Sequence, residues 1–137
     1  MQALGKHILA EFYKCDSAIL NDVALIEQLM VEAAKRARAT VISSSFHHFS
    51  PFGVSGVVVI AESHLTIHTW PEYGYASIDI YTCGNTLDPW ISFKYLVKKL
   101  KAKETSMMEV KRGLFDVEGT LKHKTDKISN EKMGVIK

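Results

Sequence analysis

The sequence predicts an α+β protein, a two-layer sandwich in which a mostly antiparallel sheet carries helices on one face. Stretches with the two-residue alternation of strands take turns with stretches of helical spacing, in the order strand, helix, several strands, helix, strand. A length of 137 residues with 47% hydrophobic content suffices for one packed domain. We assign residues 1–115 to that domain and 116–137 to a polar, lysine-rich C-terminal tail without hydrophobic period.

The first part of the chain predicts a strand, a helix and a second strand. Residues 7–13 are rich in β-forming side chains and predict the first strand. Asn21 or Asp22 can cap a helix, because apolar residues recur at helical spacing after them up to about residue 38. Residues 40–49 then predict a second strand.

The middle of the chain predicts a loop and three further strands. The sequence SPFGVSG at 50–56 has the proline and glycines of a loop. Two strands follow at 57–63 and 64–70, or one long bent element. Residues 71–74 predict a turn, and 75–83 alternate between polar and apolar side chains, so one face of this strand is expected to be wet.

The last third predicts one helix and one strand. Asp88 can cap a helix with Pro89 in its first turn, and an apolar stripe then runs towards lysines that suit a helix C-terminus. Residues 106–115 predict the last strand. Because the polar side of the strands still carries aromatic residues, we expect a second copy to cover the open sheet face in a homodimer or larger assembly.

Charge and hydropathy exclude several classes of partner. The net charge of +2 comes from 17 basic and 15 acidic residues without a dense basic block, so we expect no nucleic-acid partner. The longest apolar run, 57–61, is too short to cross a bilayer, and the N-terminus has no signal-peptide pattern. We therefore expect a cytoplasmic protein without a membrane partner, whose two cysteines remain thiols.

Residues 61–84 gather many reactive side chains in one short β-rich stretch. A zinc site from His64, His68 and Cys83 is disfavoured, because histidines four apart in a strand have Cα atoms about 13 Å apart. We expect no metal. A hydrolase built on Ser63, His68 and Asp79 is chemically conceivable, but no GxSxG elbow surrounds the serine. From composition and spacing alone, ordinary sheet residues remain the simplest interpretation.

A resemblance points to a specific chemistry. The segment GVSGVVVIAESHLTIHTWPEYGYASIDIYTCG at 53–84 resembles the processing and catalytic core of the prokaryotic S-adenosylmethionine decarboxylase proenzymes. The match extends more loosely through GKHILAEFYKCD at 5–16 and FHHFSP at 46–51. Thirty contiguous residues of this kind are highly specific.

The resemblance implies a role for five residues. The bond between Glu62 and Ser63 would be the site of self-cleavage, and Ser63 would become a pyruvoyl group that serves as the cofactor. His68 would accept a proton during processing, Cys83 would donate a proton in catalysis, and Ser55 would support processing. A histidine suits the processing role because it titrates near neutrality.

Cleavage at this bond would give a β chain, residues 1–62, and an α chain, residues 63–137. The implied reaction is decarboxylation of S-adenosylmethionine, which supplies the aminopropyl donor for spermidine synthesis. Phe49 and Trp70 could stack on the adenine, and Glu72 could bind the ribose or the sulfonium. Arginine or another basic amino acid is the alternative substrate, and a catalytically silent partner subunit is a further reading.

Parity poses a geometric problem for the implied site. Ser63 and His68 are five residues apart, and in a straight strand their side chains would point to opposite faces. A bend or bulge near Ser63, or a contribution from the partner subunit, is therefore expected.

Overall fold

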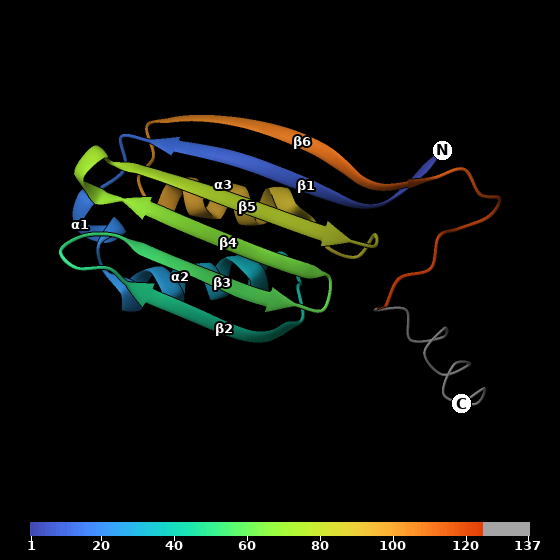
Figure 1. Ribbon diagram of the computed structural model, residues 1–137, viewed down its shortest axis with the longest axis horizontal. Helices are drawn as coiled ribbons and strands as arrows, with labels where there is room; N and C mark the ends of the chain where they lie inside the picture. The colour runs from blue at the N-terminus through green and yellow to red at the C-terminus, as the bar shows by residue number, and fades with distance from the viewer. Residues whose placement is uncertain (125–137) are drawn as a thin grey trace.

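The computed structural model describes residues 1–124 and contains one sheet of six strands in the order β2-β3-β4-β5-β1-β6 (Figure 1). The strands are β1 (Gln2–Tyr13), β2 (Val41–His48), β3 (Val54–Ile60), β4 (Ser63–Trp70), β5 (Tyr75–Cys83) and β6 (Glu104–Phe115). Every neighbouring pair is antiparallel. The predicted α+β class is confirmed.

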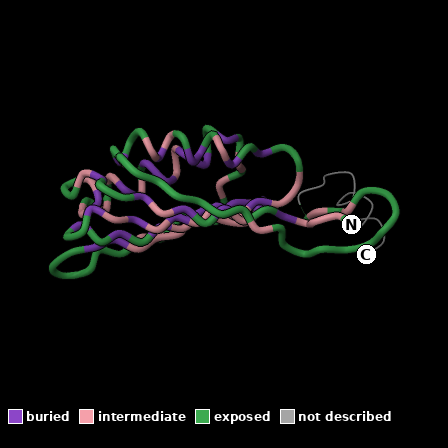
Figure 2. Tube along the Cα trace, turned by 90° about the horizontal axis from the view of Figure 1, so that it is seen from above, coloured by how far each residue is buried: buried purple, intermediate pink, exposed green. Residues whose placement is uncertain are grey.

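The helices lie together on one face of the sheet (Figure 2). They are α1 (Ser17–Leu20), α2 (Val23–Arg36) and α3 (Pro89–Lys99), and the 3-10 turn η1 (Pro71–Tyr73) joins β4 to β5. The sequence did not predict α1, which is a single turn. Asp22 and Asp88 cap α2 and α3, because each side chain accepts a hydrogen bond from a backbone N–H of the first turn.

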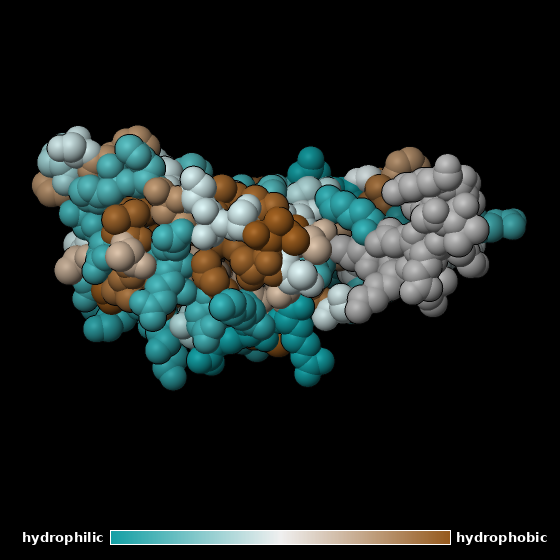
Figure 3. Space-filling view, turned by 90° about the horizontal axis from the view of Figure 1, so that it is seen from below, coloured by the Kyte–Doolittle hydropathy of each residue, from teal (hydrophilic) through white to brown (hydrophobic). Residues whose placement is uncertain are grey.

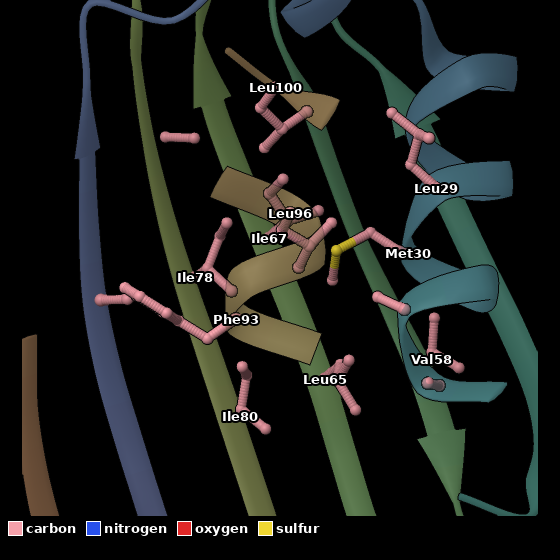
Figure 4. Packing of buried hydrophobic residues seen from close by; sticks show 14 of the residues in the cluster. Leu29, Met30, Val58, Leu65, Ile67, Ile78, Ile80, Phe93, Leu96 and Leu100 are labelled. Carbon is pink, nitrogen blue, oxygen red and sulfur yellow. The ribbon is translucent and has the colours of Figure 1, made fainter. Parts of the chain in front are cut away.

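The core fills the space between the helices and the sheet (Figure 4). In β5 the buried residues alternate with partly exposed ones, as the sequence predicts, so Ile78 and Ile80 point towards the helices. Met30 of α2 and Leu96 of α3 are fully buried against them. Because this core is tightly packed, it holds the strands in place and so supports the side chains on the other face of the sheet.

The opposite face of the sheet is open within residues 1–124 (Figure 2). It presents the alternate side chains of the strands, among them Leu9, Trp70 and Asp79. Trp70 is 41% exposed and Leu9 is 37% exposed. Apolar patches also interrupt the polar surface on the side seen from below in Figure 3, where the β2 edge lies. Among the described helices, none has the length and apolar character required to cross a membrane.

Three boundaries differ from the sequence-based expectation. The predicted break between strands at 63 and 64 is wrong, because the chain turns at Ala61 and Glu62 and β4 begins at Ser63. β1 begins earlier than predicted, and β3 begins within the predicted loop. The first of these errors arises because Ala61 and Glu62 carry none of the usual turn signals.

The C-terminal segment follows the end of β6. Residues 116–124 form no helix or strand, but Gln2 holds them through hydrogen bonds. Its amide donates to the carbonyl groups of Val117 and Gly119, and its carbonyl accepts from the Leu121 N–H at 3.3 Å. The rest of the predicted tail, 125–137, lies outside the described residues, and the domain boundary near 115 stays a prediction.

Candidate active site

The tight turn before Ser63 places unusual backbone geometry at that residue. Ile60 pairs with Ser63, so only Ala61 and Glu62 form the loop between β3 and β4. Two-residue hairpin loops normally need positive φ within the loop, which glycine or asparagine supplies. Here Ser63 itself adopts the positive value, with a φ of 141°, and neither loop residue does. A non-glycine residue in this region costs about 1–3 kcal/mol, so strain is concentrated at Ser63.

The Ser63 hydroxyl lies beside a thiol on the neighbouring strand. Ser63 Oγ is 3.3 Å from Cys83 Sγ. By simple alternation Ser63 would share the buried face with Leu65, whereas Cys83 follows Tyr81 on the open face. The positive φ at Ser63 accompanies its contact with Cys83, which a straight strand would not allow. The spacing of Ser63 and His68 had predicted such a bend near Ser63.

At this end of the sheet, β1 lies very close to β5. Gly5 pairs with Cys83, and a Cβ atom added at Gly5 would lie 2.7 Å from the Thr82 carbonyl oxygen and 3.0 Å from Cys83 Sγ. Only glycine fits this position without displacing the neighbouring strand. The absence of a side chain there leaves space beside the Cys83 thiol.

The peptide group between Glu62 and Ser63 is held by hydrogen bonds. The Cys83 backbone N–H donates to the Glu62 carbonyl oxygen at 2.7 Å. The Glu62 side chain is buried, with 5% exposure, and its carboxylate accepts from the Thr40 N–H at 3.1 Å and from the Thr40 hydroxyl at 3.3 Å. The donor aimed at the Glu62 carbonyl can stabilise negative charge that develops on this oxygen.

His68 lies at the other end of β4, paired with Ser55 of β3. Ser55 Oγ and His68 Nδ1 are 2.8 Å apart. Five residues along a strand place the Cα atoms of Ser63 and His68 about 16 Å apart. The bend at Ser63 therefore does not bring His68 to the Ser63 hydroxyl within one chain.

The three residues expected to bind substrate gather at the His68 end as well. Phe49 follows β2 and is 47% exposed, Trp70 is the last residue of β4, and Glu72 lies in η1. Glu72 lines a small cavity together with Phe52 and Asn21. A single chain thus presents two partial sites: Ser63 with Cys83 at one end of β4, and His68 with the substrate-binding candidates at the other.

A polar cluster that the sequence did not predict lies on the open face next to the Ser63 end of β4. Arg112 donates to His7 Nδ1 at 2.8 Å, and its guanidinium lies 5.1 Å from the ring centre of Tyr81. The other ring nitrogen of His7, Nε2, lies 3.6 Å from Asp79 Oδ2. Burial lowers the pKa of the nearby His64, and His7 lowers it further. Period-two alternation predicts one face for Asp79 and Tyr81, but it does not predict which strands are neighbours.

The two cysteines have different surroundings. Both are free thiols, but Cys15 is buried and burial raises its pKa to about 11, whereas Cys83 is partly exposed. Within residues 1–124 no three histidine, cysteine or acidic side chains come close enough to hold a metal ion. The Ser63 end offers a hydroxyl, a thiol and a backbone N–H, and the imidazole of His64 follows Ser63 in β4.

Comparison with known proteins identifies the family. Residues 6–113 match the family model described as S-adenosylmethionine decarboxylase. The chain belongs to this family. The S-adenosylmethionine decarboxylase proenzyme of Thermotoga maritima is 59% identical over 116 residues, which cover 85% of this chain and 89% of the relative. That of Acetivibrio thermocellus is 60% identical over 116 residues, 85% of this chain and 94% of the relative.

A solved structure in the S-adenosylmethionine decarboxylase family has the same fold. The crystal structure of the adenosylmethionine decarboxylase from Aquifex aeolicus superimposes with a TM-score of 0.81 at 38% sequence identity. The match covers 88% of this chain and 100% of that chain. The resemblance that the sequence indicated is thus confirmed.

Proposed function

We propose that this chain is a self-processing proenzyme that decarboxylates S-adenosylmethionine with a pyruvoyl group made from Ser63. The observation that carries the proposal is the geometry of the Glu62–Ser63 peptide. Its serine has a φ of 141°, its carbonyl oxygen accepts a hydrogen bond at 2.7 Å, and the Ser63 hydroxyl lies 3.3 Å from the Cys83 thiol. Relatives that are about 60% identical bear the name S-adenosylmethionine decarboxylase proenzyme.

Self-cleavage begins with the Ser63 hydroxyl. Its oxygen attacks the Glu62 carbonyl carbon, the C–N bond breaks as the hydroxyl proton passes to the nitrogen, and an ester replaces the peptide bond. The Cys83 backbone N–H stabilises the oxyanion on the Glu62 carbonyl oxygen. Removal of the Ser63 α-proton then breaks the Cβ–O bond. Residues 1–62 leave with a terminal carboxylate, and dehydroalanine remains at position 63.

Water completes the formation of the cofactor. It hydrolyses the dehydroalanine, through its imine form, to the pyruvoyl group and ammonia, so residue 63 becomes an N-terminus without an amine. The ketone of this group supplies the electron sink that decarboxylation requires and that no protein side chain provides. Cys83 holds a proton 3.3 Å from the position of Ser63 Oγ and delivers it to the substrate carbon that has lost carbon dioxide.

The remaining functional groups come from a second copy of the chain. Two sheets that pack open face to open face lie about 10 Å apart, so side chains of both reach the space between them. A two-fold axis that crosses β4 between Leu65 and Thr66 places each His68 opposite the other chain's Ser63. The same operation brings Phe49, Trp70 and Glu72 to that site. The homodimer therefore contains two complete sites.

The side chains at the shared site favour S-adenosylmethionine over arginine. A sulfonium nucleoside needs aromatic faces and an acceptor for its ribose hydroxyl groups, which Phe49, Trp70 and Glu72 offer. A guanidinium needs a carboxylate placed for two parallel hydrogen bonds. No observation favours arginine, and the names of the relatives support the first substrate. The product of the proposed reaction is the aminopropyl donor for spermidine synthesis.

Two measurements on the purified protein test this function. Intact-mass analysis should find fragments 1–62 and 63–137, the second with a mass that indicates an N-terminal pyruvoyl group, whereas Ser63→Ala should remain whole. Carbon dioxide release from equal concentrations of S-adenosylmethionine, arginine and ornithine should be fastest with the nucleoside. A single uncut active chain would refute the processing step, and a preference for either amino acid would refute the proposed substrate.

A further inference from the structure

Thr40, which no feature of the sequence singled out, contacts both residues of the turn before Ser63. Its carbonyl oxygen accepts from the Ala61 N–H at 2.9 Å. Its N–H and its hydroxyl donate to the two carboxylate oxygens of Glu62, at 3.1 Å and 3.3 Å. Thr40 directly precedes β2, the strand that pairs with β3. Three hydrogen bonds thus tie the turn to the start of the neighbouring strand.

These contacts remove the freedom by which the turn could relax. A two-residue loop reaches a comfortable conformation by adopting positive φ within the loop. The bonds from Thr40 fix Ala61 through its backbone and Glu62 through its buried side chain, and neither residue adopts positive φ. Ser63, the next residue, has the φ of 141°. The conformation of the reacting serine is therefore coupled to the Thr40 contacts.

We propose that Thr40 is a positioning residue for self-cleavage, which holds Glu62 so that the strained Ser63 directs its hydroxyl at the Glu62 carbonyl carbon. This inference rests on the proposed self-processing. The side chain and the N–H of Thr40 bond to the Glu62 carboxylate, so its effect on the scissile bond passes through Glu62. Once the bond is cut, the positive φ is no longer enforced, and Thr40 has no part in carbon dioxide release.

Removal of the Thr40 hydroxyl separates a positioning role from a general structural one. Thr40→Val removes one of the two donors to the buried Glu62 carboxylate, so the melting temperature should fall somewhat, and cleavage is compared at a temperature at which both precursors are fully folded. The rate of precursor cleavage should fall about fivefold to tenfold, as expected when a hydrogen bond to a carboxylate is lost on the way to a transition state. Thr40→Ser, which keeps the hydroxyl, should restore the rate. Thr105→Val, an exposed threonine of β6, is the matched control and should cleave like wild type.

A double-mutant comparison tests whether Thr40 acts through Glu62. Glu62→Ala should slow cleavage more than Thr40→Val, because it removes both acceptors. Adding Thr40→Val to Glu62→Ala should then have no further effect. An equal slowing of cleavage by Thr40→Val in both backgrounds would overturn the inference.

A variant with a less strained turn provides a further test, because its cleavage should slow while its stability does not fall. Ala61→Asn with Glu62→Gly supplies the residues that a two-residue loop prefers. The double variant should cleave more slowly while its melting temperature stays equal or rises. Faster cleavage in this variant would contradict the role of strain.

The outcomes also separate this inference from the proposed function. If wild-type precursor does not cut itself, the proposed function fails. If wild type cuts and Thr40→Val cuts equally fast, only the role of Thr40 fails. Fully cut Thr40→Val should release carbon dioxide from S-adenosylmethionine at the wild-type rate per cut chain, and a loss of turnover as large as the loss of cleavage would also overturn the assignment.

Discussion

His68 Nδ1 lies 2.8 Å from Ser55 Oγ, at the end of β4 that is remote from Ser63. The hydrogen bond orients the imidazole on the open face of the sheet, where no described element of the same chain covers it. A histidine so placed can serve the serine of a second chain but not its own. This relationship makes the proposed processing reaction depend on assembly.

Processing between subunits can be tested with two variants that each fail alone. His68→Ala keeps a cleavable serine, and Ser63→Ala keeps the histidine. When the two are co-expressed with different tags, the His68→Ala chain should be cut and the Ser63→Ala chain should stay whole. Random pairing limits the cut fraction to about half of the His68→Ala chains. Absence of cleavage in isolated mixed dimers would show that histidine and serine act within one chain.

Cys83 and His68 should have separable effects on processing and turnover. His68→Ala should accumulate uncut precursor, since it loses the base that we propose for cleavage. Cys83→Ala keeps the backbone N–H that contacts the Glu62 carbonyl, so it should still be cut to a useful extent. It should then lose decarboxylation or become inactive during turnover, because the proposed proton donor is missing. Gel analysis and carbon dioxide release measure the two steps, and full turnover by Cys83→Ala would remove the thiol from the mechanism.

The two cysteines should differ in reactivity towards iodoacetamide. Thiolate is the nucleophile, and with a pKa of about 11 only about a thousandth of Cys15 is ionised at pH 8. Cys83 is partly exposed and should be labelled first, as peptide mass spectrometry can show. Labelling of Cys15 should accelerate as the pH rises towards 11. Equal labelling of both thiols at pH 8 in native protein would contradict the buried position of Cys15.

His64 should make the fold sensitive to acid. Its pKa lies below the ordinary 6.5 because burial and then His7 disfavour its charged form. Below pH 6.5 the unfolded chain therefore binds more protons at this site, and stability falls as the pH falls. His64→Gln should reduce the loss of the urea midpoint between pH 7.5 and pH 5.5. His47→Gln, an exposed histidine of β2, serves as control; an unchanged loss in His64→Gln would refute the assignment.

Most of the fold follows from local patterns in the sequence. Alternation in β5 and the aspartate caps of α2 and α3 are local signals, and each correctly predicted its element. The turn at Ala61 and Glu62 was not predicted, because its contacts are with Thr40, which is 22 residues away from Glu62 in the sequence. No local pattern contains that information.

The residues assigned to the candidate site stay a prediction, and their arrangement could not be predicted from the sequence. The resemblance named Ser63, His68 and Cys83, and parity showed that a straight strand could not unite the first two. The neighbour relations that place Cys83 beside Ser63 depend on the pairing of β4 with β5. The cluster of His7 and Arg112 depends on β1 lying between β5 and β6, which is a property of the sheet topology.

The strand order bears on how the two fragments would stay together after cleavage and on whether the cut protein could refold. A cut between Glu62 and Ser63 assigns β1, β2 and β3 to one fragment and β4, β5 and β6 to the other. In the sheet β1 lies between β5 and β6, so strands of the two fragments interleave. Neither fragment can leave without breaking ladders on both sides of β1, and the nicked protein should hold together without a covalent link. After complete unfolding, however, two separate chains would have to find each other, so loss of structure in the processed enzyme is expected to be irreversible at low concentration.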